Sequence, residues 1–169
     1  MVCGMKPEEF AVALQRNFSA FGNKIIYDKT AKGEDFCEMV YYNEHQPDKP
    51  ITVTVYEDGA LLSFGNMQNV AGDKALPLDA AIQAISDIIS DKIIFIFCYE
   101  NSEKKDDGRL HDSYVFALTG DGSDMSREYE KFIASIKKPL GKIGRLFTPL
   151  KGIFAVTNFS GSVNFEIVR

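Results

Sequence analysis

Apolar residues recur with the period of an α-helix in three stretches of the chain. In the first stretch they lie four, four and three residues apart, from Phe10 to Phe21, and Gly22 follows as a C-cap. The third stretch begins at Asp124, a residue suited to capping a helix, and Pro139 is where it should end or kink. The predicted helices cover residues 7–21, 78–89 and 124–138.

Between these helices, β-branched and aromatic residues alternate with polar ones or gather in short apolar runs, which indicates strands. Asp58-Gly59 is a strong hairpin signal between two of them, and at the chain end Val163, Phe165 and Ile167 are expected to face inward. The predicted strands cover residues 24–28, 36–43, 51–56, 60–64, 92–100, 112–119, 153–158 and 162–168. Short connections favour antiparallel pairing, and the first four strands should form a meander.

The predicted order is α-ββββ-α-ββ-α-ββ, which is typical of an α+β fold with a mainly antiparallel sheet and three helices. With 169 residues, 45% of them hydrophobic, the chain is long enough to bury a sizeable core. We therefore expect residues 1–169 to form a single α+β domain.

Through residue 138, this order of elements resembles the fold of type III secretion chaperones and their non-secretion relatives, which are small acidic cytosolic proteins. The resemblance implies a module that binds another polypeptide. The fourth early strand and the strand-forming basic end depart from that family's pattern.

Charge is divided unevenly along the chain. The 24 acidic and 19 basic side chains give a net charge of −5, which opposes a general affinity for nucleic-acid phosphates. Residues 1–130 carry a balance of −11, whereas residues 131–169 carry +6. An acidic body and a basic end favour docking between proteins, and a homodimer is one expected form of it.

No stretch of the sequence approaches the length of a membrane span, and charged residues near Met1 replace the apolar run of an export signal. A soluble, cytoplasmic protein is therefore expected. Cys3, Cys37 and Cys98 are odd in number and widely spaced, which predicts free thiols, buried at the last two positions.

The sequence offers few candidates for catalysis or metal binding. His45 and His111 lie in predicted charged loops with nothing to pair them, and His111-Asp112-Ser113 cannot form a triad from neighbouring positions. His45, Glu44 and Asp48 have metal-ligand chemistry without a fixed spacing. Asp121 and Ser123 lack the bidentate acid that a calcium loop requires. We expect no catalytic set, no metal and no cofactor.

Strand tyrosines are a further candidate surface, because an exposed sheet face would present them to a ligand. Half-buried packing is the competing and favoured interpretation. The tyrosines in question are Tyr41, Tyr42, Tyr56, Tyr99 and Tyr114.

The basic segment, residues 137–151, is the stretch whose chemistry departs most from the rest. Its candidate binding residues are Lys137, Lys138, Lys142, Arg145 and Lys151. If the third helix continued past Pro139, Lys131, Lys138, Lys142 and Arg145 would form one stripe on it, a pattern that suits an anionic lipid surface or an acidic partner. Proline and two glycines oppose such a helix, so a basic loop is the favoured form.

Gly141 to Arg145 also resembles the GXXG loop with which KH domains clamp single-stranded nucleic acid. The stretch that follows is too short for the family's second helix, because Pro149 interrupts it. Three hypotheses thus stay open: a non-enzymatic, chaperone-like protein-binding module, which is favoured; binding of nucleic acid or anionic lipid through the basic segment; and a small-molecule enzyme.

Overall fold

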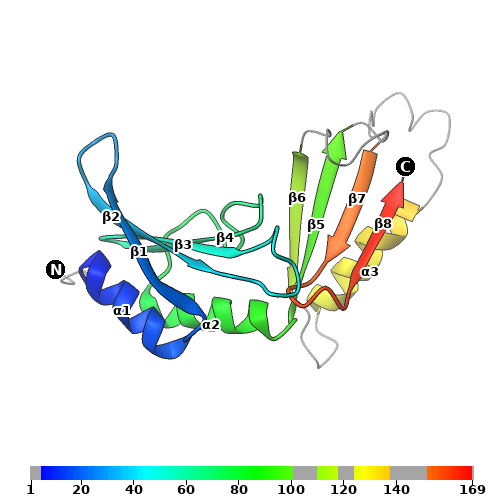
Figure 1. Ribbon diagram of the computed structural model, residues 1–169. Coiled ribbons are helices and arrows are strands. Elements are labelled where there is room, and N and C mark those ends of the chain that lie inside the picture. Colours follow the sequence, from blue (N-terminus) through cyan, green and yellow to red (C-terminus); the bar gives the residue numbers. More distant parts are fainter. Residues whose placement is uncertain (1–4, 101–109, 118–123, 138–151, 169) are drawn as a thin grey trace. The chain divides into compact units, whose positions relative to one another are not determined.

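The chain folds as two compact units, Met1–Ile89 and Ser90–Arg169, each with a four-stranded antiparallel sheet (Figure 1). The computed structural model describes residues 5–100, 110–117, 124–137 and 152–168. Its elements follow the order α-ββββ-α-ββ-α-ββ, so the predicted α+β class and element order are confirmed. That residues 1–169 act as a single domain stays a prediction.

The first unit is a meander of four strands between two helices in sequence. Its elements are α1 (Pro7–Asn17), β1 (Phe21–Lys29), β2 (Asp35–Tyr41), β3 (Ile51–Tyr56), β4 (Gly59–Phe64) and α2 (Leu78–Ile89). The strands pair antiparallel in the order β1-β2-β3-β4, as expected for a meander. Both helices lie against the same face of this sheet (Figure 1).

Alternation of side chains explains why the first sheet is covered on one face. Successive residues of a strand point to opposite faces, and in β3 the residues Ile51, Val53 and Val55 are buried while Thr52 and Thr54 are half-buried. Residues of β2 and β4 that pair with buried residues of β3 lie on the same inner face, and those that pair with Thr52 and Thr54 lie on the outer face. The inner face packs on residues that α1 and α2 bury, among them Phe10, Leu14, Ala81 and Ile85.

The first helix is shorter than its periodicity predicts. The helix predicted to Phe21 ends at Asn17, and Phe18, not Gly22, is the C-cap; Phe18 is extended at φ −134° and ψ 94°. Phe21 instead opens β1, where its ring meets Tyr41 edge-on with centroids 5.2 Å apart. An apolar residue suits either role, so the spacing alone placed Phe21 in the wrong element.

The two edges of the first sheet differ. At β4, the segment Met67–Leu76 folds back along the strand: the Ala60 N–H donates to the Leu76 carbonyl oxygen (2.9 Å) and the Val70 N–H donates to the Leu62 carbonyl oxygen (2.9 Å). At the other edge, β1 pairs with β2 alone within the described part of the chain. One edge is therefore closed by hydrogen bonds, whereas the other is open.

The second unit places one helix on a sheet of strand order β6-β5-β7-β8. Its elements are β5 (Ile93–Glu100), β6 (Leu110–Ala117), α3 (Asp124–Lys137), β7 (Gly152–Thr157) and β8 (Asn164–Val168). Ile94, Ile96 and Cys98 of β5 form a buried cluster with Ile133 of α3, which Tyr129 and Phe132 border. The neighbours of these β5 residues, Phe95 and Phe97, are buried as well.

The last strand is only in part the inward-facing strand that its alternation predicts. Val163 and Ile167 pack against the buried cluster of the second unit. Phe165 alternates in step with them along the chain, yet its side chain is 38% exposed in this edge strand.

Candidate functional site

The outer face of the first sheet, on the side opposite α1 and α2, is the candidate site. Its side chains come from every second residue of β2, β3 and β4. They are Phe36, Glu38, Val40, Thr52, Thr54, Tyr56, Leu61 and Ser63, and all are half-buried. An antiparallel sheet commonly leaves one face to solvent, and here that face mixes hydroxyls, apolar groups and carboxylates.

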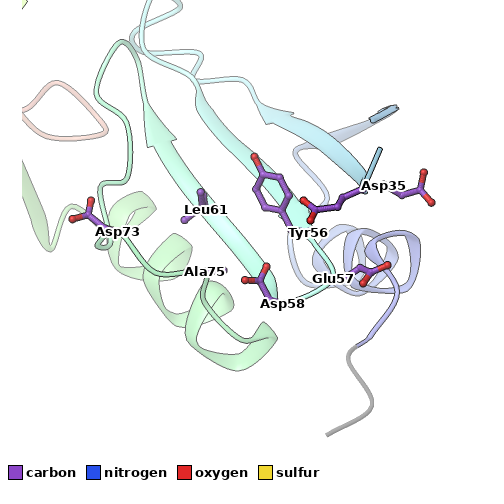
Figure 2. A pocket seen from close by; sticks show the side chains of 8 residues that line it. Asp35, Tyr56, Glu57, Asp58, Leu61, Asp73 and Ala75 are labelled. Carbon is purple, nitrogen blue, oxygen red and sulfur yellow. The ribbon is translucent and has the colours of Figure 1, made fainter. Parts of the chain in front are cut away.

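An acidic hollow of about 440 Å³ lies at one end of this face (Figure 2). Tyr56 and Leu61 line it together with five carboxylate residues. These are Glu34, Asp35, Glu57, Asp58 and Asp73. Figure 2 shows Tyr56 and Asp58 between Asp73 and Asp35.

The topology explains why these acids converge. In a meander, the β1–β2 turn and the β3–β4 turn lie at the same end of the sheet, and each carries a pair of acids, Glu34-Asp35 and Glu57-Asp58. Asp73 reaches the same end on the segment whose Leu76 is hydrogen-bonded to Ala60. Three chain segments therefore bring their carboxylates to one hollow.

A second, polar hollow of about 510 Å³ adjoins the first, because Tyr56 and Leu61 line both. Hydroxyl and amide groups dominate its other walls, and Glu38 contributes a sixth carboxylate. The polar side chains are Thr52, Thr54, Ser63, Asn66, Gln68 and Asn69. The two hollows form one continuous surface with an acidic end and a hydroxyl-rich end.

Tyr56, which lines both hollows, forms an aromatic pair with Phe36 of the neighbouring strand. The rings of Phe36 and Tyr56 are 5.8 Å apart between centroids and tilted by 33°. Aromatic faces attract cations and bury the apolar stems of Lys and Arg, so this pair suits the same ligand charge as the carboxylates.

The lining residues of the two hollows include no Lys or Arg. A basic group nearby is Lys29, whose Nζ lies 2.8 Å from Asp35 Oδ1. The side-chain hydrogen bond and the charge of Asp35 raise the Lys29 pKa, so this ammonium stays protonated. The charge of Asp35 is thus partly neutralised by Lys29. The other acids that line the hollows have no basic residue beside them in the lining.

On the inner face of the same sheet, Cys37 is fully buried and its Sγ lies 3.4 Å from the Pro7 carbonyl oxygen. Burial, with a smaller contribution from the charge of Glu8, raises the pKa of this thiol to about 11. Such a thiol is protonated and inert at neutral pH. Cys98 is also buried, and neither cysteine forms a disulfide, so the prediction for both cysteines is confirmed.

The basic residues singled out from the sequence are not part of this surface. Lys137 is the last residue of α3, and Lys138, Lys142, Arg145 and Lys151 lie outside the described residues. α3 is described as far as Lys137. The form of residues 139–151 and their role in binding stay predictions.

Both histidines were predicted to lie in loops, and only one of them does. His45 lies exposed in a loop, where its backbone N–H donates to Asn43 Oδ1 (3.0 Å). His111 lies in β6 rather than in a loop, because the strand begins at Leu110. Within the described ranges, no three His, Cys, Asp or Glu side chains are grouped so as to hold a metal ion. Asp121 and Ser123 lie outside those ranges.

Three of the strand tyrosines are packing residues, as favoured, and the side chain of Tyr114 lies outside the described residues. Tyr41, Tyr56 and Tyr99 are half-buried, and each ring contacts a phenylalanine. Tyr42 lies one residue beyond β2 and is 68% exposed. Of these, Tyr56 belongs to the candidate site, which the sequence signals only through the acid pairs at the two turns.

Comparison with protein-family models, with curated proteins and with solved structures finds no match. The resemblance to secretion chaperones therefore stays a prediction. Among the described helices, none has the length and apolar character needed to cross a bilayer.

Proposed function

We propose that the protein is a non-enzymatic binding module that holds a basic segment of another polypeptide on the outer face of its first sheet. The observation that carries the proposal is the continuous surface that six carboxylate residues and Tyr56 line and in whose lining no basic residue occurs.

The chemistry of the surface fits such a ligand at both of its ends. Carboxylates at the acidic end attract Lys and Arg side chains, and the rings of Phe36 and Tyr56 accept the stems of these side chains. Hydroxyls of Thr52, Thr54 and Ser63 at the other end can donate to and accept from peptide groups. An anionic ligand would meet like charge at the same place.

Binding is favoured over catalysis because the lining residues include no histidine, cysteine or lysine. Acyl transfer of the Ser-His or Cys-His type would therefore have neither its thiol nor its imidazole base in this lining. The buried thiol of Cys37 lies on the inner face and does not reach this surface.

A peptide titration tests the proposal. The probe is a synthetic, labelled peptide with the sequence of residues 137–151, which combines five basic residues with apolar ones. Fluorescence anisotropy at low salt should show saturable binding to the full chain. The double variant Asp58→Asn, Asp73→Asn should bind at least about fivefold more weakly, since two carboxylates are lost. Asn at position 58 preserves the turn, because Asn-Gly is itself a favoured hairpin pair.

The matched control is Glu9→Gln, Glu44→Gln, which removes the same charge from residues that do not line the hollows. This control should bind as the wild type does. Equal weakening by both double variants would mean that only net charge matters, and would contradict a defined site. Absence of binding at low salt would contradict the proposal outright.

A further inference from the structure

The open edge of the first sheet carries three consecutive apolar residues. Ile25, Ile26 and Tyr27 lie in the middle of β1, and the side chains of Ile26 and Tyr27 are 43% and 56% exposed. Natural sheets commonly protect an exposed edge with charges, proline or a covering segment. At β4 such a covering segment is present, whereas at the centre of β1 apolar side chains face solvent.

The hydrogen-bond pattern tells which backbone groups of β1 point outward. In an antiparallel pair, alternate residues bond to the partner strand, and the others direct their N–H and C=O groups away from it. At β4 the groups of Ala60, Leu62 and Phe64 point outward, since they bond to the covering segment. The registers of the three strand pairs carry this alternation across the sheet.

At β1, the outward residues are Ile25, Tyr27 and Lys29. The Thr30 N–H donates to the Glu34 carbonyl oxygen (2.9 Å), which independently places the even residues of β1 in bonds to β2. The Lys29 N–H is taken by Asp28 Oδ1 (2.8 Å). The outward backbone groups of Ile25 and Tyr27 thus form the accessible edge.

We infer that this edge pairs with β1 of a second copy of the chain, antiparallel about a two-fold axis at Ile26. In that register Ile25 faces Tyr27 of the other copy. The outward N–H of each residue donates a hydrogen bond to the outward C=O of the other. The two Ile26 side chains meet at the axis. The result is a continuous eight-stranded sheet whose two outer faces stay free, so this inference does not depend on the proposed function.

The sequence of β1 is complementary to itself in charge, which favours a second copy of this chain as the partner over a strand of a different protein. Lys24 and Asp28 stand two residues on either side of Ile26. An antiparallel register centred on Ile26 therefore sets opposite formal charges at facing positions, at both ends of the pairing. The closed edge at β4 cannot accept a strand in the same way, which limits growth to a dimer at this sheet.

Sedimentation equilibrium of the full chain tests the inference, with the wild type expected to be dimeric at micromolar concentration. Ile26→Lys places two like charges at the axis and should raise the dissociation constant at least about tenfold. The control Val12→Lys changes a similarly exposed residue of α1, 39% exposed against 43% for Ile26, and should leave the dimer intact.

A backbone variant separates strand pairing from side-chain contact. Tyr27→Pro removes an outward N–H that β2 does not use and should weaken the dimer, whereas Tyr27→Phe keeps that N–H and should not. Circular dichroism checks that each variant folds. In the wild type, exchange of the Ile25 and Tyr27 amides should slow at dimeric concentrations, while the Ile26 amide stays slow throughout.

Two outcomes would overturn the inference. One is a wild-type chain that is monomeric throughout the concentration range. The other is a dimer that both Ile26→Lys and Tyr27→Pro leave unchanged; dissociation of such a dimer in high salt would assign it to contact between the acidic body and the basic end.

Discussion

The two sheets of the molecule bury their side chains in different ways. In the first sheet, buried and half-buried residues alternate along β3, and one face is left for binding. In the second, β5 buries five consecutive residues, Ile94–Cys98. The difference shows that strict alternation marks a sheet with a free face, whereas a continuous apolar run marks a strand buried on both faces.

The largest expected effect tests this contrast directly with adjacent residues. Leu62→Ala, on the inner face of β4, should lower the free energy of unfolding by about 2–5 kcal/mol, whereas Leu61→Ala should cost less than about 1 kcal/mol. In β5, both Ile96→Ala and Phe97→Ala should cost about 2–5 kcal/mol. Urea denaturation followed by circular dichroism measures all four. Equal costs at Leu61 and Leu62 would remove the distinction between the sheets.

A smaller loss of stability is expected at Gly59, where the covering segment is hydrogen-bonded to the edge strand β4 of the first sheet. Gly59 has φ +137°, and a Cβ there would overlap the Leu76 carbonyl oxygen. Gly59→Ala should therefore destabilise the fold by about 2–4 kcal/mol through strain and displacement of the covering segment. Gly33, with φ +83° and open space around it, is the control, and Gly33→Ala should cost about 1–2 kcal/mol. Thermal unfolding compares the two variants, and a larger cost at Gly33 would count against the closed edge.

In the second unit, a side-chain hydrogen bond of Asp91 holds the turn before β5. Asp91 has φ +58°, and its Oδ1 accepts a hydrogen bond from the Ser160 N–H at 2.8 Å, which joins this turn to the β7–β8 connection. Asp91→Ala should cost about 1–3 kcal/mol, because it removes this bond and disfavours the backbone conformation. Asp91→Asn, which keeps an acceptor and tolerates positive φ, should cost less than about 1 kcal/mol. If the two variants were equally stable in urea, the bond would have no structural role.

A pH dependence is expected from the first unit as well. Because burial raises the Cys37 pKa to about 11, the folded state favours the neutral thiol. The resulting stabilisation is fully present below the pKa of the unfolded thiol, near 9, and is lost as pH rises toward 11. The difference in unfolding free energy between the wild type and Cys37→Ala should therefore narrow between pH 9 and 11. A constant difference in urea titrations across that range would argue against an ionising buried thiol.

Much of the fold follows from local pattern. Alternation in Ile51–Tyr56 and the Asp58-Gly59 pair were sufficient to predict two strands and their turn, because both signals are local. The end of α1 was not predictable from spacing, since Phe18 and Phe21 continue the helical period while the chain has already become extended. Tertiary contact with Tyr41, not local preference, places Phe21 in β1.

The candidate site was harder to predict from the sequence than the fold. The acids that line its hollow lie on three separate segments, and only the meander topology brings Asp35, Asp58 and Asp73 to one end of the sheet. The sum of charges along the sequence points instead to the basic segment, residues 137–151. By contrast, the half-buried aromatic pair Phe36 and Tyr56 carries no sequence signal beyond its strands.

The most direct test of the free outer face is a map of backbone amide chemical shifts as the 137–151 peptide is added to the full chain. If a basic peptide binds this face, the largest changes will occur in β2, β3 and β4 and around Asp58 and Asp73, with little change in α1 and α2. Changes confined to the second unit, or to the helices that cover the inner face, would contradict binding to this face.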